Sequence, residues 1–135
     1  MSEENLERFK RGIAAYNRRD IEAALEELDP AVEWHPAVAG MFGREATVLL
    51  GREEVRKGLQ DLLEAFNDLR IELSEFRDLG DELLAFGRVH GHGTESGVET
   101  DSTLAWLVRV KNGRAVWVGT YLDPKDALEA ARLSE

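Results

Sequence analysis

The spacing of apolar residues changes from a helical period to a strand period near Leu69, and this change limits the folds open to the chain. Before it, Leu6, Phe9, Ile13 and Tyr16 recur at the spacing of one helix face. After it, apolar and polar residues alternate, as in half-buried strands. Helices followed by strands predict an α+β fold, in which the helices cover the apolar face of an antiparallel sheet.

Turn and capping signals divide the two halves into elements. Asp20 is placed to cap a second helix, Asp29 and Pro30 are expected to end it, and the Asn-Gly pair at 112–113 is a strong hairpin signal. A twisted sheet wrapped over helices makes a cone-shaped roll, and a pocket would form at its open end. We expect one domain over 1–135, with helices over 6–16, 21–28 and 52–66, a strand over 31–35, irregular structure over 37–50, a four-strand antiparallel meander over 70–76, 83–92, 100–110 and 115–122, and a short C-terminal helix.

Composition and charge exclude several classes of protein. The chain has no cysteine, which excludes a disulfide scaffold, a thiolate zinc site and a cysteine nucleophile. Its net charge of −10 repels phosphate backbones and anionic lipids, so we expect neither nucleic acid nor a membrane as a partner. The apolar runs are too short to span a bilayer, and the acidic N-terminus lacks the pattern of a signal peptide. We therefore expect a cytoplasmic protein.

Four stretches of the chain carry a resemblance to a known family. They are YNRRD at 16–20, VEWHP at 32–36, GREEVRKG at 51–58 and YLDPKDAL at 121–128. Together with the meander, they resemble the SnoaL-like, ketosteroid-isomerase-like superfamily, also called nuclear-transport-factor-two-like. The resemblance implies the cone-shaped fold. It does not specify a function, because the superfamily includes isomerases, polyketide cyclases, epoxide hydrolases, dehydratases and non-catalytic members.

The catalytic groups of these relatives are mostly missing at the matching positions. His35 falls where ketosteroid isomerases place their aspartate base, Gly12 where they place a tyrosine, and Trp106 near their protonated aspartate. The last-strand aspartate of limonene-type epoxide hydrolases falls at Thr120. Asp123 is the candidate for the late aspartate of SnoaL-type cyclases.

His35 and Asp123 are the candidate catalytic residues. Histidine exchanges protons near neutral pH, so His35 could act as a proton acceptor. The alternative is a histidine hydrogen-bonded at the junction of strand and loop beside Pro36. For Asp123 the alternative is a helix cap, because Pro124 follows it.

The expected ligand is a small hydrophobic molecule held inside the cone. Trp106 shares a strand face with Leu104 and Val108, and we expect it to face the same cavity as His35. Core packing is the alternative for Trp106 and for Tyr16. The candidate ligand-binding residues are Trp34, Trp106, Tyr16, Val118 and Thr120.

A metal or cofactor is not expected, and a homodimer is. His90 and His92 lie on one side of a strand, but no third ligand stands at a recognisable spacing. An apolar patch on the outer sheet face, which a monomer rarely leaves open, predicts a homodimer through that face. The patch consists of Phe86, Leu107, Trp117 and Tyr121.

Two functions remain open from the sequence. One is a cofactor-independent acid/base enzyme of the isomerase, cyclase or lyase type, with His35 as proton acceptor. The other is a non-catalytic ligand-binding or dimeric interaction module. A catalytic site needs a second polar group to stabilise developing charge, and the sequence identifies no certain one.

Overall fold

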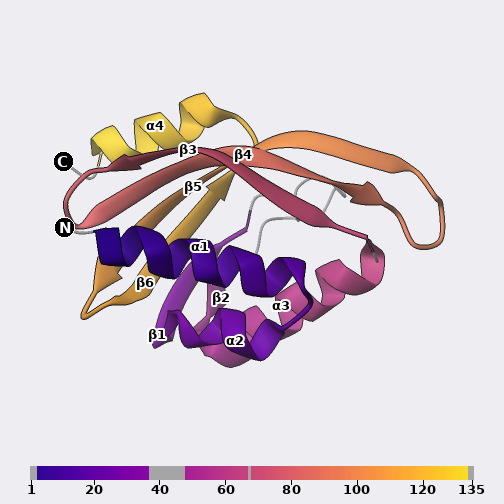
Figure 1. Ribbon diagram of the computed structural model, residues 1–135, viewed down its shortest axis with the longest axis horizontal. Coiled ribbons are helices and arrows are strands. Elements are labelled where there is room, and N and C mark those ends of the chain that lie inside the picture. The colour runs from indigo at the N-terminus through magenta and orange to yellow at the C-terminus, as the bar shows by residue number, and fades with distance from the viewer. Residues whose placement is uncertain (1–2, 37–47, 67, 134–135) are drawn as a thin grey trace.

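A curved sheet bends over three helices, and a fourth helix lies on its other face (Figure 1). The computed structural model describes residues 3–36, 48–66 and 68–133. Within these ranges the elements are α1 (Glu3–Asn17), α2 (Ile21–Glu26), β1 (Leu28–His35), β2 (Leu49–Leu50), α3 (Gly51–Ala65), β3 (Arg70–Asp78), β4 (Glu82–His92), β5 (Glu99–Lys111), β6 (Arg114–Tyr121) and α4 (Pro124–Leu133).

The sheet confirms the predicted antiparallel meander and adds two strands to it. Its order is β2-β1-β6-β5-β4-β3, and β3 to β6 pair antiparallel with their neighbours in the sequence. β1 runs parallel to β6 and antiparallel to the short β2, which the sequence did not predict. The α+β class and the order of helices and strands are confirmed.

The capping and turn signals act as the sequence predicts. The Asp20 carboxylate accepts a hydrogen bond from the Ala23 N–H at 3.1 Å and caps α2. Asn112 and Gly113 have φ values of 53° and 80°, the left-handed conformation that a two-residue hairpin turn requires.

The predicted end of α2 is wrong. The helix ends at Glu26, and Leu28 already belongs to β1, where it pairs with Ala115 of β6. The register of β1 against β6 shifts between Leu28 and Glu33. Pro30, which has no N–H to donate, lies in this irregular part of the ladder and is therefore tolerated within a strand. Of the irregular segment predicted over 37–50, residues 37–47 lie outside the described residues.

The concave face of the sheet packs against α1, α2 and α3. Trp106, Ala85 and Val89 are each at most 2% exposed and belong to one core cluster, which confirms the predicted inward orientation of Trp106 in β5. Asn17, at the end of α1, exchanges two hydrogen bonds of 2.9 Å with the backbone of Ile71 in β3. This pair of hydrogen bonds fixes α1 to the edge of the sheet.

The outer apolar patch is covered in part by α4 of the same chain. Leu107 is fully buried, and Ala127 and Ala131 of α4 pack in the same cluster, together with Phe86, Trp117 and Tyr121, which are partly buried. The part of the patch left open on the monomer is therefore smaller than the sequence indicated. The homodimer itself stays a prediction. None of the described helices is long and apolar enough to cross a membrane.

Replacing Ala127 with glutamate should remove α4 from the outer face of the sheet. The side chain of Ala127 is fully buried, and a charge buried there without a partner should lower the free energy of unfolding by more than about 2 kcal/mol in a denaturant melt. Lys125→Glu, at an exposed position of α4, is the matched control and should change stability by at most about 0.5 kcal/mol. Equal stability of both variants would contradict this packing.

Candidate functional site

The candidate site is an interior cavity between the concave face of the sheet and helices α1 to α3. Its volume is about 1380 Å³, above the range of about 300–1,000 Å³ that is usual for small-molecule pockets. It reaches from Gly113 at the β5–β6 hairpin to Ser96 at the β4–β5 hairpin. Much of its wall is aliphatic or aromatic, including Phe9, Ile13, Leu28, Val55, Leu59, Leu62, Phe66, Leu69, Leu83, Val89, Leu104 and Val108.

Tyr16 belongs to this wall and carries a hydroxyl group. The residue ends the apolar stripe of α1 and is 4% exposed. Its hydroxyl oxygen is buried and has no hydrogen-bond partner among the described residues. Burial raises the pKa of the Tyr16 phenol well above its usual value, so the hydroxyl keeps its proton at neutral pH and can donate it to a hydrogen bond.

The other predicted ligand-binding residues also line the cavity. Trp106 is 2% exposed and packs edge-on against Phe9, with ring centroids 5.8 Å apart. Trp34 and Val118 lie in the wall, as does Thr120, whose hydroxyl donates to the His35 carbonyl at 3.0 Å. The structure brings the five candidates together. Their contact with a ligand stays a prediction.

The side chain of the candidate catalytic histidine, His35, lies on the face of β1 that points away from the cavity. His35 Nε2 is 2.9 Å from Glu33 Oε2, and its ring packs on Trp117 at 4.9 Å between centroids. Because side chains alternate along a strand, Trp34 faces the cavity and His35 faces away from it. The hydrogen bond to His35 holds the pKa of Glu33 below its usual value. The expectation that His35 and Trp106 share a cavity is wrong.

Asp123 also lies outside the cavity wall. It is exposed, and its carboxylate accepts a hydrogen bond from the Lys125 N–H at 2.9 Å in the first turn of α4. This is the capping role that the sequence left open as the alternative.

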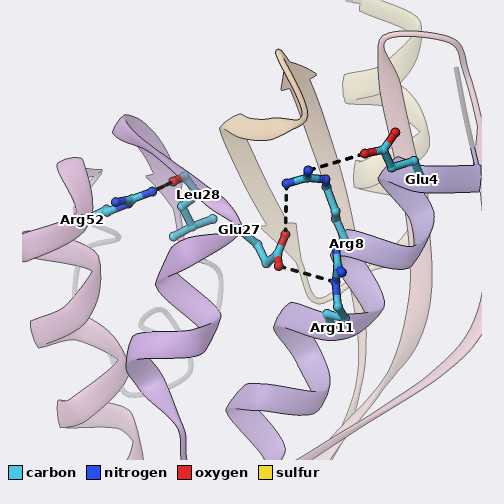
Figure 2. Close-up of polar contacts among 6 residues, drawn as sticks. All are labelled: Glu4, Arg8, Arg11, Glu27, Leu28 and Arg52. Carbon is cyan, nitrogen blue, oxygen red and sulfur yellow. Dashed lines mark hydrogen bonds and ion pairs between the residues drawn. The ribbon is translucent and has the colours of Figure 1, made fainter.

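The described cavity wall contains six charged residues that the sequence did not single out: Arg8, Glu27, Lys57, Asp61, Glu64 and Glu95. Arg8 Nη1 of α1 lies 3.8 Å from Glu27 Oε2, at the end of α2, and Arg11 Nε lies 3.6 Å from Glu27 Oε1 (Figure 2). Gly12 was the available signal, because it interrupts the apolar stripe of α1. A Cβ atom at Gly12 would lie 3.7 Å from Glu27 Cγ, so the glutamate side chain packs over the bare backbone of this glycine.

The histidine pair on β4 is engaged by carboxylates. His90 Nε2 lies 3.1 Å from Glu72, and His92 bonds to Asp68 through both its backbone N–H and its ring, each at 2.6 Å. The described residues contain no group of three or more side chains that could hold a metal ion.

Comparison with protein families decides the relationship that the four stretches suggested. The model of the SnoaL-like domain matches residues 9–118. The chain belongs to the SnoaL-like family. Comparison of this SnoaL-like chain with curated proteins finds no match.

Solved structures share the fold of this SnoaL-like protein. An NTF2-like protein of unknown function from Burkholderia pseudomallei is 24% identical, with 96% of this chain and 97% of that chain covered and a TM-score of 0.79. TerC, co-crystallized with polyporic acid, is 24% identical, with 93% of this chain and 96% of that chain covered and a TM-score of 0.77. A protein from Jannaschia that is named a SnoaL-like polyketide cyclase is 16% identical. The match covers 94% of this chain and 90% of that chain, with a TM-score of 0.74. At these identities the likeness shows the fold alone.

The contact between Asp68 and His92 predicts a pH dependence for this SnoaL-like protein. The hydrogen bond to Asp68 raises the pKa of His92 above the ordinary value, and His92 in turn lowers the pKa of Asp68. The stabilising contribution of the ion pair is therefore present between the lowered pKa of Asp68 and the raised pKa of His92, and it is lost as the pH rises through the pKa of His92 or falls through that of Asp68.

Asp68→Asn should lower the pKa of His92, measured by NMR titration of its imidazole carbon-bound protons. Asp101→Asn is the control, because Asp101 pairs with Arg88 rather than with a histidine and should leave the His92 midpoint unchanged. An unchanged midpoint in Asp68→Asn would show that the contact does not form in solution.

Proposed function

We propose that this chain binds a small, mainly hydrophobic molecule in the interior cavity and anchors it by a hydrogen bond to the Tyr16 hydroxyl. The observation that carries the proposal is a large, mainly apolar cavity whose wall includes Tyr16, a residue with a buried hydroxyl that has no hydrogen-bond partner among the described residues. A buried hydroxyl without a partner costs about 1–3 kcal/mol in the unliganded protein. A ligand with an oxygen or nitrogen acceptor beside Tyr16 would remove this cost.

The shape and lining of the cavity support the same class of ligand. Small-molecule sites combine apolar walls with a few polar groups that fix the orientation of the ligand. Trp34, which is only partly buried, contributes a flat apolar surface, and the nearly buried Trp106 and Tyr16 belong to the same wall. The co-crystallisation of TerC with polyporic acid is consistent with an organic ligand for this fold.

An acid/base enzyme of the isomerase, cyclase or lyase type is the second candidate. His35 and Asp123 do not support it, because neither lines the cavity. Glu27 favours it, because Glu27 and Tyr16 both belong to the cavity wall, and a base together with a hydrogen-bond donor is the minimum for proton transfer. Deuterium incorporation into a carbon of the identified ligand in D₂O would indicate proton transfer, and a binding protein would give none.

Native mass spectrometry of the protein purified from a bacterial host tests ligand binding directly. We expect a mass in excess of the chain, which organic extraction removes and returns as a small, mainly apolar compound. A protein that carries no adduct and binds nothing from an extract of the host would contradict the proposal.

Tyr16→Phe should separate ligand binding from stability. Since the change removes only an unpartnered buried hydroxyl, the free energy of unfolding of the unliganded protein should stay equal or rise by about 1 kcal/mol. The affinity for the extracted ligand should fall about 2- to 10-fold, measured by isothermal titration calorimetry. His35→Ala is the control and should leave the affinity unchanged, because His35 lies outside the cavity wall. A large loss of stability in Tyr16→Phe would show that its hydroxyl is paired within the protein.

A further inference from the structure

The exposed residues of the cavity wall, among those that the structure describes, all lie on two elements. These elements are α3 and the hairpin between β4 and β5, and the exposed residues are Lys57, Asp61, Glu64, Ala65, Thr94, Glu95, Ser96 and Val98. In Figure 1 the β4–β5 hairpin reaches past the end of α3, on the side of the molecule away from the N-terminus. The described part of the cavity therefore opens to solvent between α3 and this hairpin.

Charged side chains close the other end of the cavity, at the β5–β6 hairpin. Arg8 Cζ lies 3.4 Å from the position that a Cβ atom would take at Gly113, so the guanidinium group packs against the bare backbone of the turn. Figure 2 shows Glu4, Arg8, Arg11 and Glu27 as one connected group across this end. Both wall residues of the group, Arg8 and Glu27, are only partly exposed.

Hydrogen bonds join the end of α3 to the end of β4 and its hairpin. The Thr94 N–H donates to the Ala65 carbonyl at 2.8 Å, and the Thr94 hydroxyl donates to the Glu64 carbonyl at 2.7 Å. The Asp68 carboxylate accepts from the His92 N–H and contacts the His92 ring, each at 2.6 Å. We call these contacts of Thr94 and His92 the seam.

The seam can open without disturbing the apolar core. All of its residues are exposed, so water can replace the hydrogen bonds that they lose, and such regions open locally at a low cost in free energy. α3 itself is held elsewhere, because it packs on β1, β2 and α2, and its residues Leu59 and Leu62 pack against the main core cluster. The hairpin is therefore the side of the seam that is free to move.

We propose that the seam is the gate of the cavity, through which a ligand enters and leaves when the tip of the β4–β5 hairpin separates from the end of α3. This inference rests on the proposed function, because it concerns access to the same cavity. The seam consists of contacts within the protein and closes in the same way over an empty or an occupied cavity. Its strength therefore changes the rates of binding and release by one factor and leaves the affinity unchanged.

N-Phenyl-1-naphthylamine, an uncharged apolar molecule whose fluorescence rises when it leaves water, is the probe. Stopped-flow fluorescence gives its association and dissociation rates. NMR locates the bound probe through the tryptophan indole N–H signals. Those of Trp34 and Trp106, in the cavity wall, should shift, and that of Trp117, on the outer face, should not.

Thr94→Val should raise both rates about 2- to 10-fold, because it removes the hydrogen bond to the Glu64 carbonyl and keeps the size of the side chain. The dissociation constant of the probe should stay the same. Thr103→Val is the matched control, since the Thr103 hydroxyl also donates to a backbone carbonyl, that of Leu122 at 2.6 Å, but lies outside the cavity wall. It should leave both rates unchanged.

A disulfide across the seam should have the opposite effect. Ala65 and Thr94 are joined by a backbone hydrogen bond, which places them close enough for a disulfide. The chain has no cysteine, so the double variant Ala65→Cys, Thr94→Cys can form one intramolecular disulfide only. Its oxidised form should bind and release the probe at least about tenfold more slowly than its reduced form, which is the control.

The outcomes separate the gate from the proposed function. Equal rates in the oxidised and the reduced form, with the cavity indoles shifted by the probe, would overturn the gate but leave cavity binding intact. A wild-type protein in which the probe shifts neither cavity indole would overturn the proposed function itself.

Discussion

The alternation of side chains along strongly curved strands is the constraint on which the rest of the structure depends. Every strand of the meander must supply one set of side chains to the cavity and another to the outer face. Trp106 and Leu107 are neighbours in β5, yet one lines the cavity and the other lies buried under α4. Part of each face is therefore covered within one chain, by α1 to α3 on the concave side and by α4 on the outer side.

The same alternation explains what the sequence predicted well and what it did not. Periodicity and turn chemistry are local properties, so the meander, the α2 cap and the hairpin at Asn112 followed from them. The orientation of β1 did not, because a shift of one residue exchanges the two faces of a strand. The resemblance to ketosteroid isomerases favoured His35 as the residue that faces the cavity, whereas the alternation along β1 directs Trp34 into it.

Long-range placement accounts for the remaining errors. Arg8 and Glu27 lie 19 positions apart in the sequence, and only the return of α2 along α1 brings them together. Nothing local marks either residue as part of a cavity wall. Gly12 is a local irregularity of α1, because a helix accepts a glycine at a cost, and the Glu27 side chain packs beside it. The cover of the outer face by α4 is equally non-local.

The buried hydroxyl of Tyr16 also bears on why the cavity is not closed by larger side chains. Filling the space with aliphatic side chains would bury more apolar surface, but the Tyr16 hydroxyl would then stay without a hydrogen-bond partner among the described residues. A protein with a total stability of about 5–15 kcal/mol carries few such groups. Under the proposed function, a ligand that supplies the missing acceptor would recover this cost as affinity, so the cost of the unliganded state would also be a source of selectivity.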